Sequence, residues 1–321
     1  MGVNSGEILF VKSVKDGIPN RDPLADSDAR RIFGENDGRI SLSDVSIKRD
    51  VRDYVQMAYP DGGELKNRFI YVREERDEKG KLLGRSSLAD KLLERTGNAK
   101  GPIRENLIQA AFDVRSFGAV FSVKNESFKL TGPVQFGWAH SLHPVETRYV
   151  QGTVVMPSKD TKDSSGEAND EGKSQGTIWT SYILPFAVFA MPGVINASIA
   201  KEAMLEPDDV ELLLEALWRG TQQRQARGRG IQQPLFLMHV EYRDPLFRIG
   251  YLEEGIRLLP DKEEWTNGQP PSSVQEISLD VSGLFDLLKQ YQDKIARCRL
   301  WLNPSLQLKG DTSMMNLQPL W

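Results

Sequence analysis

Histidine and cysteine side chains are the first candidates for acid–base, nucleophilic or metal chemistry, and this chain has three histidines and one cysteine. His140 and His143 form an H-x-x-H pair, but Pro144 follows at once, so we expect a turn with packing histidines. His239 alternates with apolar neighbours in a strand-like run, and Cys298 has no histidine beside it. The sequence therefore predicts no catalytic residue, no metal site and no cofactor. It also contains no phosphate-binding loop, dinucleotide fingerprint or nucleophile elbow.

Three aspartates in a long polar segment could in principle hold a cation. Asp22, Asp26 and Asp28 lie between residues 15 and 39, a stretch rich in Gly, Asn and Asp. Their spacing is not that of an EF-hand loop, and a solvated loop explains them as simply. Loops of this length inside a compact domain are usually functional or disordered, so the segment remains a candidate binding loop.

Basic side chains give a clearer pattern. Lys48, Arg49 and Arg52 lie three or four residues apart, largely off the apolar face of a predicted helix, and can form one cationic patch. Asp50 and Asp53 dilute this patch, so an ordinary solvated helix face is the alternative interpretation.

A second basic cluster is free of acidic neighbours, because no Asp or Glu occurs from Ala216 to Val240. That stretch contains Arg219, Arg224, Arg227 and Arg229, the last two within the glycine-containing run RGRG. Planar guanidinium groups on a loop that permits close backbone approach suit the binding of phosphate. A third feature is the run DVRSFG, whose glycine turn is expected to place Arg115 and backbone amides at a strand entrance.

The elements that must position these side chains alternate irregularly along the chain. Ile47, Val51 and Val55 recur at helical spacing after Ser43 and give the first helix its buried face. Hydrophobic periodicity and capping signals predict further helices over 86–97, 102–112, 196–205, 207–219 and 280–295. Strands are predicted over 7–14, 69–73, 117–123, 134–138, 148–156, 179–191, 234–242 and 274–279. This order indicates an α+β or mixed α/β class.

One insertion stands out between two strand-like runs. Residues 158–176 contain no aromatic, branched aliphatic or proline residue. Such a segment buries too little apolar surface to offset its ordering entropy, so we expect the tip of a projecting hairpin arm.

Composition and charge place the chain among globular proteins. It has 321 residues, of which 39% are hydrophobic and 27% charged, with a net charge of -4. Residues 1–150 hold 24 basic and 22 acidic side chains, and residues 151–321 hold 17 and 23, so the halves carry +2 and -6. No signal sequence or membrane-length apolar run is evident, so we expect a cytoplasmic protein with no membrane partner.

Six segments, in order, resemble the backbone subunits of type I CRISPR interference complexes (Cascade), most closely the subtype I-B branch. They are SLSDVSIKRDVRDYV (Ser41–Val55), DVRSFGAVF (Asp113–Phe121), GPVQFGWAHSLHPVE (Gly132–Glu146), PFAVFAMPGVIN (Pro185–Asn196), DDVELLLEALWRGT (Asp208–Thr221) and PLFLMHVEY (Pro234–Tyr242). Any one of these segments is weak evidence, whereas six in the family's order are specific.

The resemblance implies an α+β fold with a ferredoxin-like (RRM-like) β-sheet palm, inserted helical segments and a β-hairpin thumb. Mapped onto this chain, residues 1–321 form a single elaborated domain with a discontinuous palm core. The helical insertion falls at about 60–112, the thumb at about 145–182 and a C-terminal strand and helix segment at 234–321.

The resemblance also implies a function without chemistry. Copies of the family polymerise head to tail along a guide (CRISPR) RNA, grip its sugar–phosphate backbone, and present its bases for pairing with target DNA. Their partners are therefore guide RNA, target DNA, neighbouring copies, other Cascade subunits and a recruited helicase–nuclease.

Residue by residue, the family's RNA-contacting elements coincide with the basic clusters. The implied RNA-binding residues are Arg21, Lys48, Arg49, Arg52, Arg115, Ser116, Gly118, Gln135, Arg224, Arg227 and Arg229. The arginine loop is the loosest match, since this chain reads QQRQARGRG where many relatives carry a TRS-type stretch.

Two other functions remain open at this point. One is a metal-dependent endoribonuclease of the same fold, which would act on target or precursor RNA through Asp22, Asp26 or Asp28. The other is a scaffold that touches no RNA.

Overall fold

The computed structural model describes residues 2–25, 27–97, 101–123, 126–154, 178–226 and 228–321. Its centre is an eight-stranded sheet, seven strands of which form one continuous path. In order across the sheet these are β15 (Asn316–Leu317), β13 (Ile295–Leu302), β10 (Ile231–Tyr242), β1 (Gly6–Lys15), β9 (Phe186–Ile195), β6 (Ala139–Ser141) and β2 (Ser41–Leu42). The eighth strand, β5 (Val134–Phe136), pairs with β9 beside β6. The α+β class predicted from the sequence is thus confirmed.

Strand β1 lies at the middle of this sheet because both of its faces are apolar. It pairs antiparallel with β9 and with β10 along its whole length. Ile8 and Phe10 point into one hydrophobic cluster, and Leu9 and Val11 point into another on the opposite face. A strand that alternates between two cores needs a layer on each side of the sheet.

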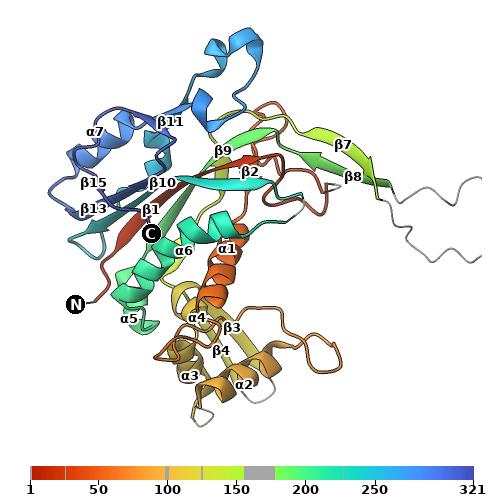
Figure 1. Ribbon diagram of the computed structural model, residues 1–321. Helices are drawn as coiled ribbons and strands as arrows, with labels where there is room; N and C mark the ends of the chain where they lie inside the picture. Colours follow the sequence, from red (N-terminus) through yellow and green to blue (C-terminus); the bar gives the residue numbers. More distant parts are fainter. Residues whose placement is uncertain (1, 26, 98–100, 124–125, 155–177, 227) are drawn as a thin grey trace, which may run out of the picture.

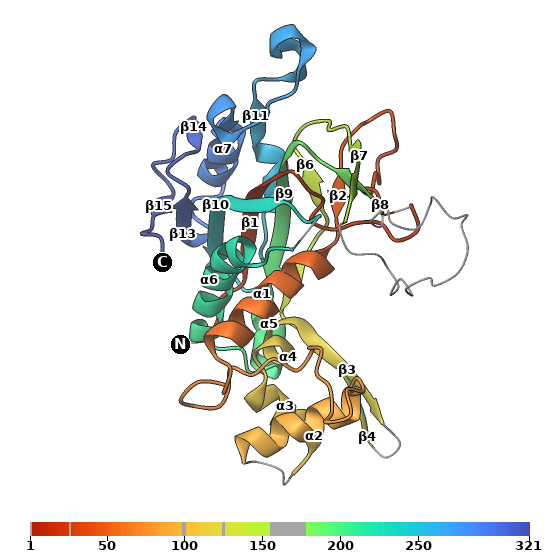
Figure 2. The ribbon, with the colours of Figure 1, turned by 45° about the vertical axis from the view of Figure 1, so that its right-hand side comes forward.

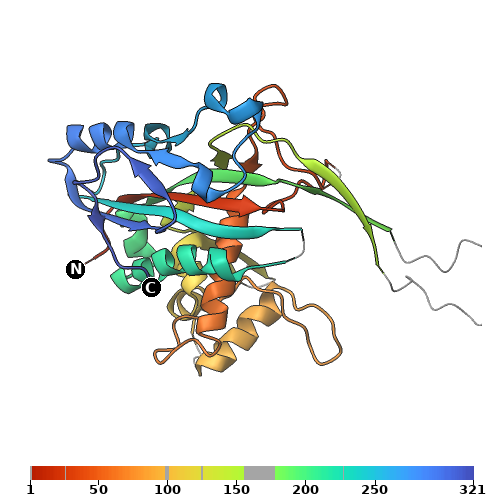
Figure 3. The same cartoon turned by 45° about the horizontal axis from the view of Figure 1, so that its top comes forward.

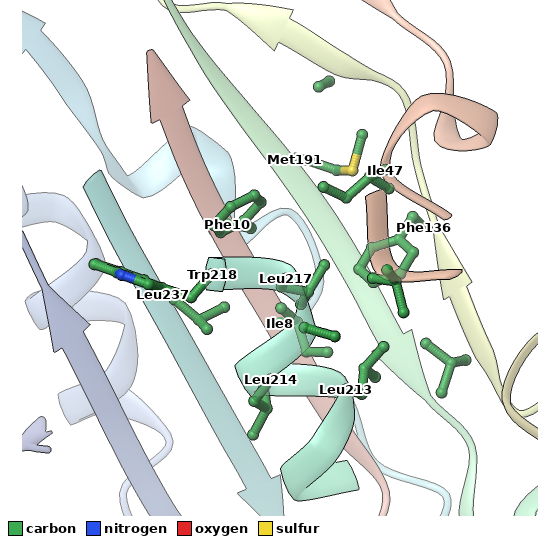
Figure 4. Packing of buried hydrophobic residues seen from close by; sticks show 14 of the residues in the cluster. Ile8, Phe10, Ile47, Phe136, Met191, Leu213, Leu214, Leu217, Trp218 and Leu237 are labelled. Carbon is green, nitrogen blue, oxygen red and sulfur yellow. The ribbon is translucent and has the colours of Figure 1, made fainter. Parts of the chain in front are cut away.

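Helices α1 (Asp44–Ala58) and α6 (Pro207–Gln223) form the layer on one face, where Figures 1 and 2 show them side by side. Figure 4 shows Leu213, Leu214 and Leu217 of α6 directed at the sheet, each almost fully buried. Burying a leucine side chain contributes about 1.5–3 kcal/mol, so this face holds the two helices firmly. The short helix α5 (Ala197–Glu202) links β9 to α6.

The C-terminal part of the chain covers the other face. Helix α7 (Ser282–Gln290) contributes Leu284 and Leu288 to the second cluster. A small sheet lies beside it, with the order β11 (Arg257–Leu259), β12 (Ser278–Asp280) and β14 (Gln307–Lys309). Four short 3-10 helices, η1 (Leu252–Gly255), η2 (Lys262–Glu264), η3 (Thr266–Gly268) and η4 (Val274–Glu276), connect these elements.

A separate lobe extends from the end of α1 and has its own hydrophobic cluster, which runs from Phe69 to Leu130 and includes Ala203. The lobe contains α2 (Arg85–Thr96), α3 (Ile103–Ala110) and the hairpin of β3 (Gly118–Val123) with β4 (Glu126–Thr131). Helix α4 (Phe112–Phe117) joins it to the main body (Figure 1).

Strands β7 (Arg148–Thr153) and β8 (Ile178–Ile183) pair only with each other and project from the body as a two-stranded arm (Figure 3). Residues 155–177 lie outside the described part of the chain, so the predicted arm tip at 158–176 is not described. The arm itself matches the hairpin that the sequence predicts.

Several sequence predictions of elements are wrong. The predicted strand over 69–73 is absent apart from an isolated bridge at Phe69, and the predicted strand over 274–279 is the 3-10 helix η4 followed by β12. The single strand predicted over 179–191 is two strands, β8 and β9, because the chain breaks at Leu184 and Pro185. The helix predicted over 280–295 ends at Gln290, and Ile295 begins β13. The turn predicted at DVRSFG is the helix α4, which ends where Gly118 takes a positive φ of 80°. Within the described residues, no helix is long and apolar enough to cross a membrane.

Candidate nucleic-acid interface

The outer stripe of helix α1 is the surface on which the predicted basic residues converge. Val45 is 65% exposed and the side chain of Arg49 is 48% exposed. These two residues are four apart and therefore share one face of the helix. Basic clusters flank this stripe on both sides, and each is held by a buried carboxylate.

The first cluster, which we call the Phe117 cluster, contains Lys48, Arg52, Phe117 and Gln135. Lys48 donates to Gln135 Oε1 over 3.4 Å, and its ammonium lies 5.6 Å from the centre of the Phe117 ring. The Arg52 guanidinium lies 5.3 Å from the same ring. Two cations thus lie near one aromatic ring, an arrangement that favours positive charge at this point on the surface.

Asp113 fixes the orientation of Arg52. Its fully buried carboxylate accepts from Arg52 Nε at 2.9 Å and from the backbone amides of Tyr71 at 2.8 Å and Val72 at 3.1 Å. One carboxylate therefore connects α1, α4 and the segment that enters the lobe. Charge-assisted bonds of this kind leave little freedom to the guanidinium.

The second cluster, which we call the Asp50 cluster, brings together β1, α1 and the loop after α6. Asp50 is fully buried and accepts from Lys12 Nζ at 3.3 Å, Arg224 Nη1 at 2.7 Å and Arg229 Nη2 at 3.2 Å. Lys12 also donates to Gln232 Oε1 at 3.0 Å. Gly220 of α6 permits this approach, because a Cβ there would lie 2.5 Å from the Asp50 carbonyl oxygen.

The charges of the Asp50 cluster do not cancel. Three cations surround one carboxylate. Beside them, Asp53 accepts from Arg49 Nε at 2.6 Å and forms an ion pair with Arg224 Nε at 3.3 Å. Burial lowers the pKa of Lys12 and of Arg229, although Asp50 acts in the opposite direction on both. Positive charge is therefore in excess here, and an anion at the surface would relieve it.

Arg21 occupies a different place from the other cations. It donates to Ser27 O, Ser181 Oγ, Tyr182 O and Gly228 O at 2.8–2.9 Å. Its side chain thereby ties the loop after β1 to the base of the β7–β8 arm and to the arginine loop.

Arg115 and Ser116 are buried within the fold. Arg115 donates to both carboxylate oxygens of Asp209 at 2.9 and 2.7 Å and to the carbonyl oxygens of three further residues, Asn67, Ile108 and Gln109. These bonds use the donor capacity of its guanidinium. Ser116 is fully buried as well.

Gly118 lets the β3–β4 hairpin close against α4. A Cβ at this position would lie 2.2 Å from the Leu130 carbonyl oxygen, and the positive φ already favours glycine. Phe117 and Gly118 line a cavity of about 410 Å³ whose walls include Arg73 and Arg85. Of the remaining predicted site residues, Arg227 lies outside the described residues.

The groups considered for metal or acid–base chemistry have structural partners. His140 Nδ1 and Ser41 Oγ are 2.9 Å apart, and Asp22 accepts from the Leu24 amide. Asp28 accepts from the Ala29 amide and from Thr147 Oγ1. Asp26 lies outside the described residues, and among those described no three His, Cys, Asp or Glu side chains gather as metal ligands would.

Sequence reasoning missed the residues that organise the site. Asp50 appeared only as a charge that dilutes the basic patch, and Lys12, Phe117 and Asp113 were not singled out. The sequence did offer one indication of these residues, since each charged side chain stands where its element is otherwise buried. Lys12 lies within the apolar strand β1, and Asp50 lies next to Val51 on the inner side of α1. Such residues are rarely buried without partners.

Comparison with known proteins gives consistent matches. The sequence model of a family described as CRISPR-associated protein Cas7 matches residues 4–282. A curated protein from Haloferax volcanii, named CRISPR-associated protein Cas7, is 28% identical over 99% of this chain and 93% of its own length.

Solved structures match over nearly the whole chain as well. A chain of a CRISPR RNA-guided surveillance complex, pre-nicking, has a TM-score of 0.55 at 15% identity, covering 96% of each chain. A chain of another CRISPR RNA-guided surveillance complex has a TM-score of 0.54 at 14% identity, covering 99% of this chain and 95% of its own. At these identities the structures indicate a shared fold.

Proposed function

The chain belongs to the CRISPR-associated protein Cas7 family, and on that premise we propose that it is a non-catalytic backbone subunit of a type I CRISPR interference complex in the cytoplasm. It holds guide RNA by the sugar–phosphate backbone and leaves the bases free to pair with target DNA. Its further partners are neighbouring copies, other Cascade subunits and a recruited helicase–nuclease. Subtype I-B is the branch that the sequence segments resemble most.

The strand order supports a ferredoxin-like palm. Strands β1, β6, β9 and β10 occur in that order along the chain and lie in the order β10, β1, β9, β6 across the sheet. Helix α1 follows β1 and helix α6 precedes β10, and both pack on the same face. The β7–β8 arm serves as the thumb, and α2, α3 and the β3–β4 hairpin are the insertion. The whole chain is one elaborated domain.

One observation carries the proposed RNA site: the exposed stripe of α1 lies between two preorganised basic clusters. The Phe117 cluster flanks it on one side and the Asp50 cluster on the other. Both clusters present guanidinium groups, which suit phosphate oxygens. A guide holder must accept any sequence, so it should grip backbone rather than base edges.

The proposed contacts divide by exposure. Residues on the α1 stripe and its two flanks contact phosphate or ribose: Lys48, Arg49, Arg52, Gln135, Arg224, Arg227 and Arg229. Arg115, Ser116 and Gly118 act by shaping helix α4 and its junction with β3, since the first two are buried. Arg21 acts by holding the arm and the arginine loop in place.

The test is RNA binding by the full chain as a function of salt concentration. We expect Arg52→Ala to weaken binding by a similar factor on unrelated RNA sequences and to lower the salt slope by about 0.7, the contribution of one phosphate contact on single strands. Arg95→Ala, at an exposed ion pair with Glu75 in the lobe, is the matched control and should bind like the wild type. Loss of binding confined to one RNA sequence would contradict backbone recognition.

The non-catalytic part of the proposal has its own assay. Full-length protein incubated with Mg²⁺ or Mn²⁺ and single-stranded RNA should leave the RNA intact. Cleavage that disappears in Asp22→Ala would instead favour the endoribonuclease.

A further inference from the structure

The negative charge of Asp50 is unexpected in a site that would bind RNA by positive charge alone. It is an acidic side chain at the centre of a basic cluster, with no exposed surface. A buried carboxylate is costly unless it is paired and hydrogen-bonded. If positive charge alone determined RNA affinity, removing Asp50 would improve the site.

The geometry points to the opposite role: Asp50 is a positioning residue that holds Arg224 and Arg229 in a preorganised clamp for a phosphate group. This inference rests on the proposed function, because it specifies how one flank of the proposed RNA site is built. The acceptor is the single oxygen Oδ1, which Arg224 Nη1 and Arg229 Nη2 approach within 2.7 and 3.2 Å. Two guanidinium groups that share one oxygen are forced into neighbouring positions.

The second carboxylate oxygen keeps Asp50 itself in place. Oδ2 accepts from Lys12 Nζ, and the same ammonium is held by Gln232 Oε1. The carboxylate is therefore anchored to β1 and β10, the central strands of the sheet. Since sheet strands are rigid, the clamp position is set by the core and not by the loop after α6.

Other contacts hold each arginine from a second direction. Arg224 Nη1 also donates to the Ser46 carbonyl at 3.2 Å, and Arg229 Nη1 donates to the Pro19 carbonyl. Arg224 Nη2 contacts no acceptor among the described residues, and the Arg224 side chain keeps 24% of its surface exposed. Both N–H groups of Arg224 Nη2 are thus available to a phosphate oxygen at the surface.

The experiment compares two neutralisations that add the same charge. Asp50→Asn removes the clamp acceptor. Glu215→Gln adds the same charge on α6, at a carboxylate that pairs with Tyr54 and Arg219 and contacts neither clamp arginine. Affinity for a short labelled single-stranded RNA is measured over a range of salt concentrations, and thermal unfolding is followed on the same samples.

We expect Asp50→Asn to bind RNA about tenfold or more weakly despite its added positive charge, with a salt slope lower by about 0.7. Glu215→Gln should bind as well as the wild type or a few-fold more tightly. A merely destabilised fold lowers the active fraction without changing the salt slope. Wild-type or tighter binding by folded Asp50→Asn would overturn the inference.

A second variant covers the case in which Asp50→Asn does not fold. Lys12→Met combined with Asp50→Asn removes one charge of each sign from the interior and keeps the buried net charge unchanged. Weak binding with a reduced slope supports the clamp, and wild-type affinity overturns it. If wild-type protein and Arg52→Ala both fail to bind RNA, the proposed function fails, and this outcome is distinct from failure of the clamp alone.

Discussion

At the scale of single residues, buried ionic pairs decide which basic side chains face outward. The Arg115 guanidinium donates to Asp209 and to backbone carbonyls inside the fold. The arginine in the run DVRSFG therefore stabilises the fold. Lys48 and Arg49 pair with partly exposed carboxylates, and Arg52 pairs with the buried Asp113 through Nε while its guanidinium lies near the Phe117 ring. Arg115 and Arg52 therefore differ in exposure and in how many of their N–H donors the fold already uses.

The buried His143 side chain makes the stability of the fold depend on pH. Burial lowers the pKa of His143 to about 4, from an ordinary value of 6.5, although the hydrogen bond to the Pro144 carbonyl acts in the opposite direction. Between pH 4 and 6.5 the unfolded chain binds more protons at His143 than the folded chain does. The contribution of neutral His143 to the free energy of unfolding is therefore complete above about pH 6.5 and is lost as the pH falls toward 4.

We expect the free energy of unfolding to fall by about 2–3 kcal/mol through His143 across this window, as measured by urea denaturation at several pH values. His143→Gln should flatten part of this pH dependence. His239, whose pKa is also lowered to about 4 by burial, contributes in the same window and remains in the variant. An unchanged pH profile in His143→Gln would refute the assignment.

At the scale of elements, local periodicity predicted most of the secondary structure but not the contacts between distant segments. The inner face of α1 followed from Ile47, Val51 and Val55, and all three are fully buried. The failure at 280–295 has a physical cause, since Ile295 fits a helical period yet is required as the first residue of β13. Periodicity cannot distinguish a residue that continues a helix from one that begins a strand beyond a turn.

For the candidate site, too, the sequence predicted the elements but not the contacts between them. Apolar periodicity predicted the helix, and charge together with glycine predicted the loop that carries the arginines. The carboxylates that orient them were not predicted, because Asp50 meets Lys12 and Arg229 across 38 and 179 residues of sequence. Contacts over such separations depend on sheet topology, which the local sequence pattern does not encode.

The β7–β8 arm depends on Arg21 for its attachment. A two-stranded hairpin is marginally stable alone, and Arg21 supplies hydrogen bonds to Ser181 and Tyr182 at its base. We expect Arg21→Ala to raise amide hydrogen exchange in β7 and β8 without a comparable rise in β1 or β9. The measurement is hydrogen–deuterium exchange with mass spectrometry. Arg39→Ala, which removes a local pair with Asp37, is the control, and equal exchange in wild type and Arg21→Ala would contradict this role.

At the scale of the whole molecule, a net charge of -4 coexists with a proposed RNA surface because charge is organised locally. The two basic clusters need to line only one groove, while acidic side chains elsewhere keep the total negative. In the assembly proposed above, head-to-tail contacts between copies would be heterologous and would not close, so a chain of copies could extend for as long as the RNA does. These features are the ones that a sequence-independent guide holder requires.

The most direct test of the central claim is the affinity of the full chain for two guide RNAs of equal length and unrelated sequence, measured at the same salt concentrations. Backbone gripping predicts affinities equal within about twofold and parallel salt slopes, both lowered alike by Arg52→Ala. A difference of about tenfold or more between the two RNAs, or binding that does not respond to salt, would contradict the account.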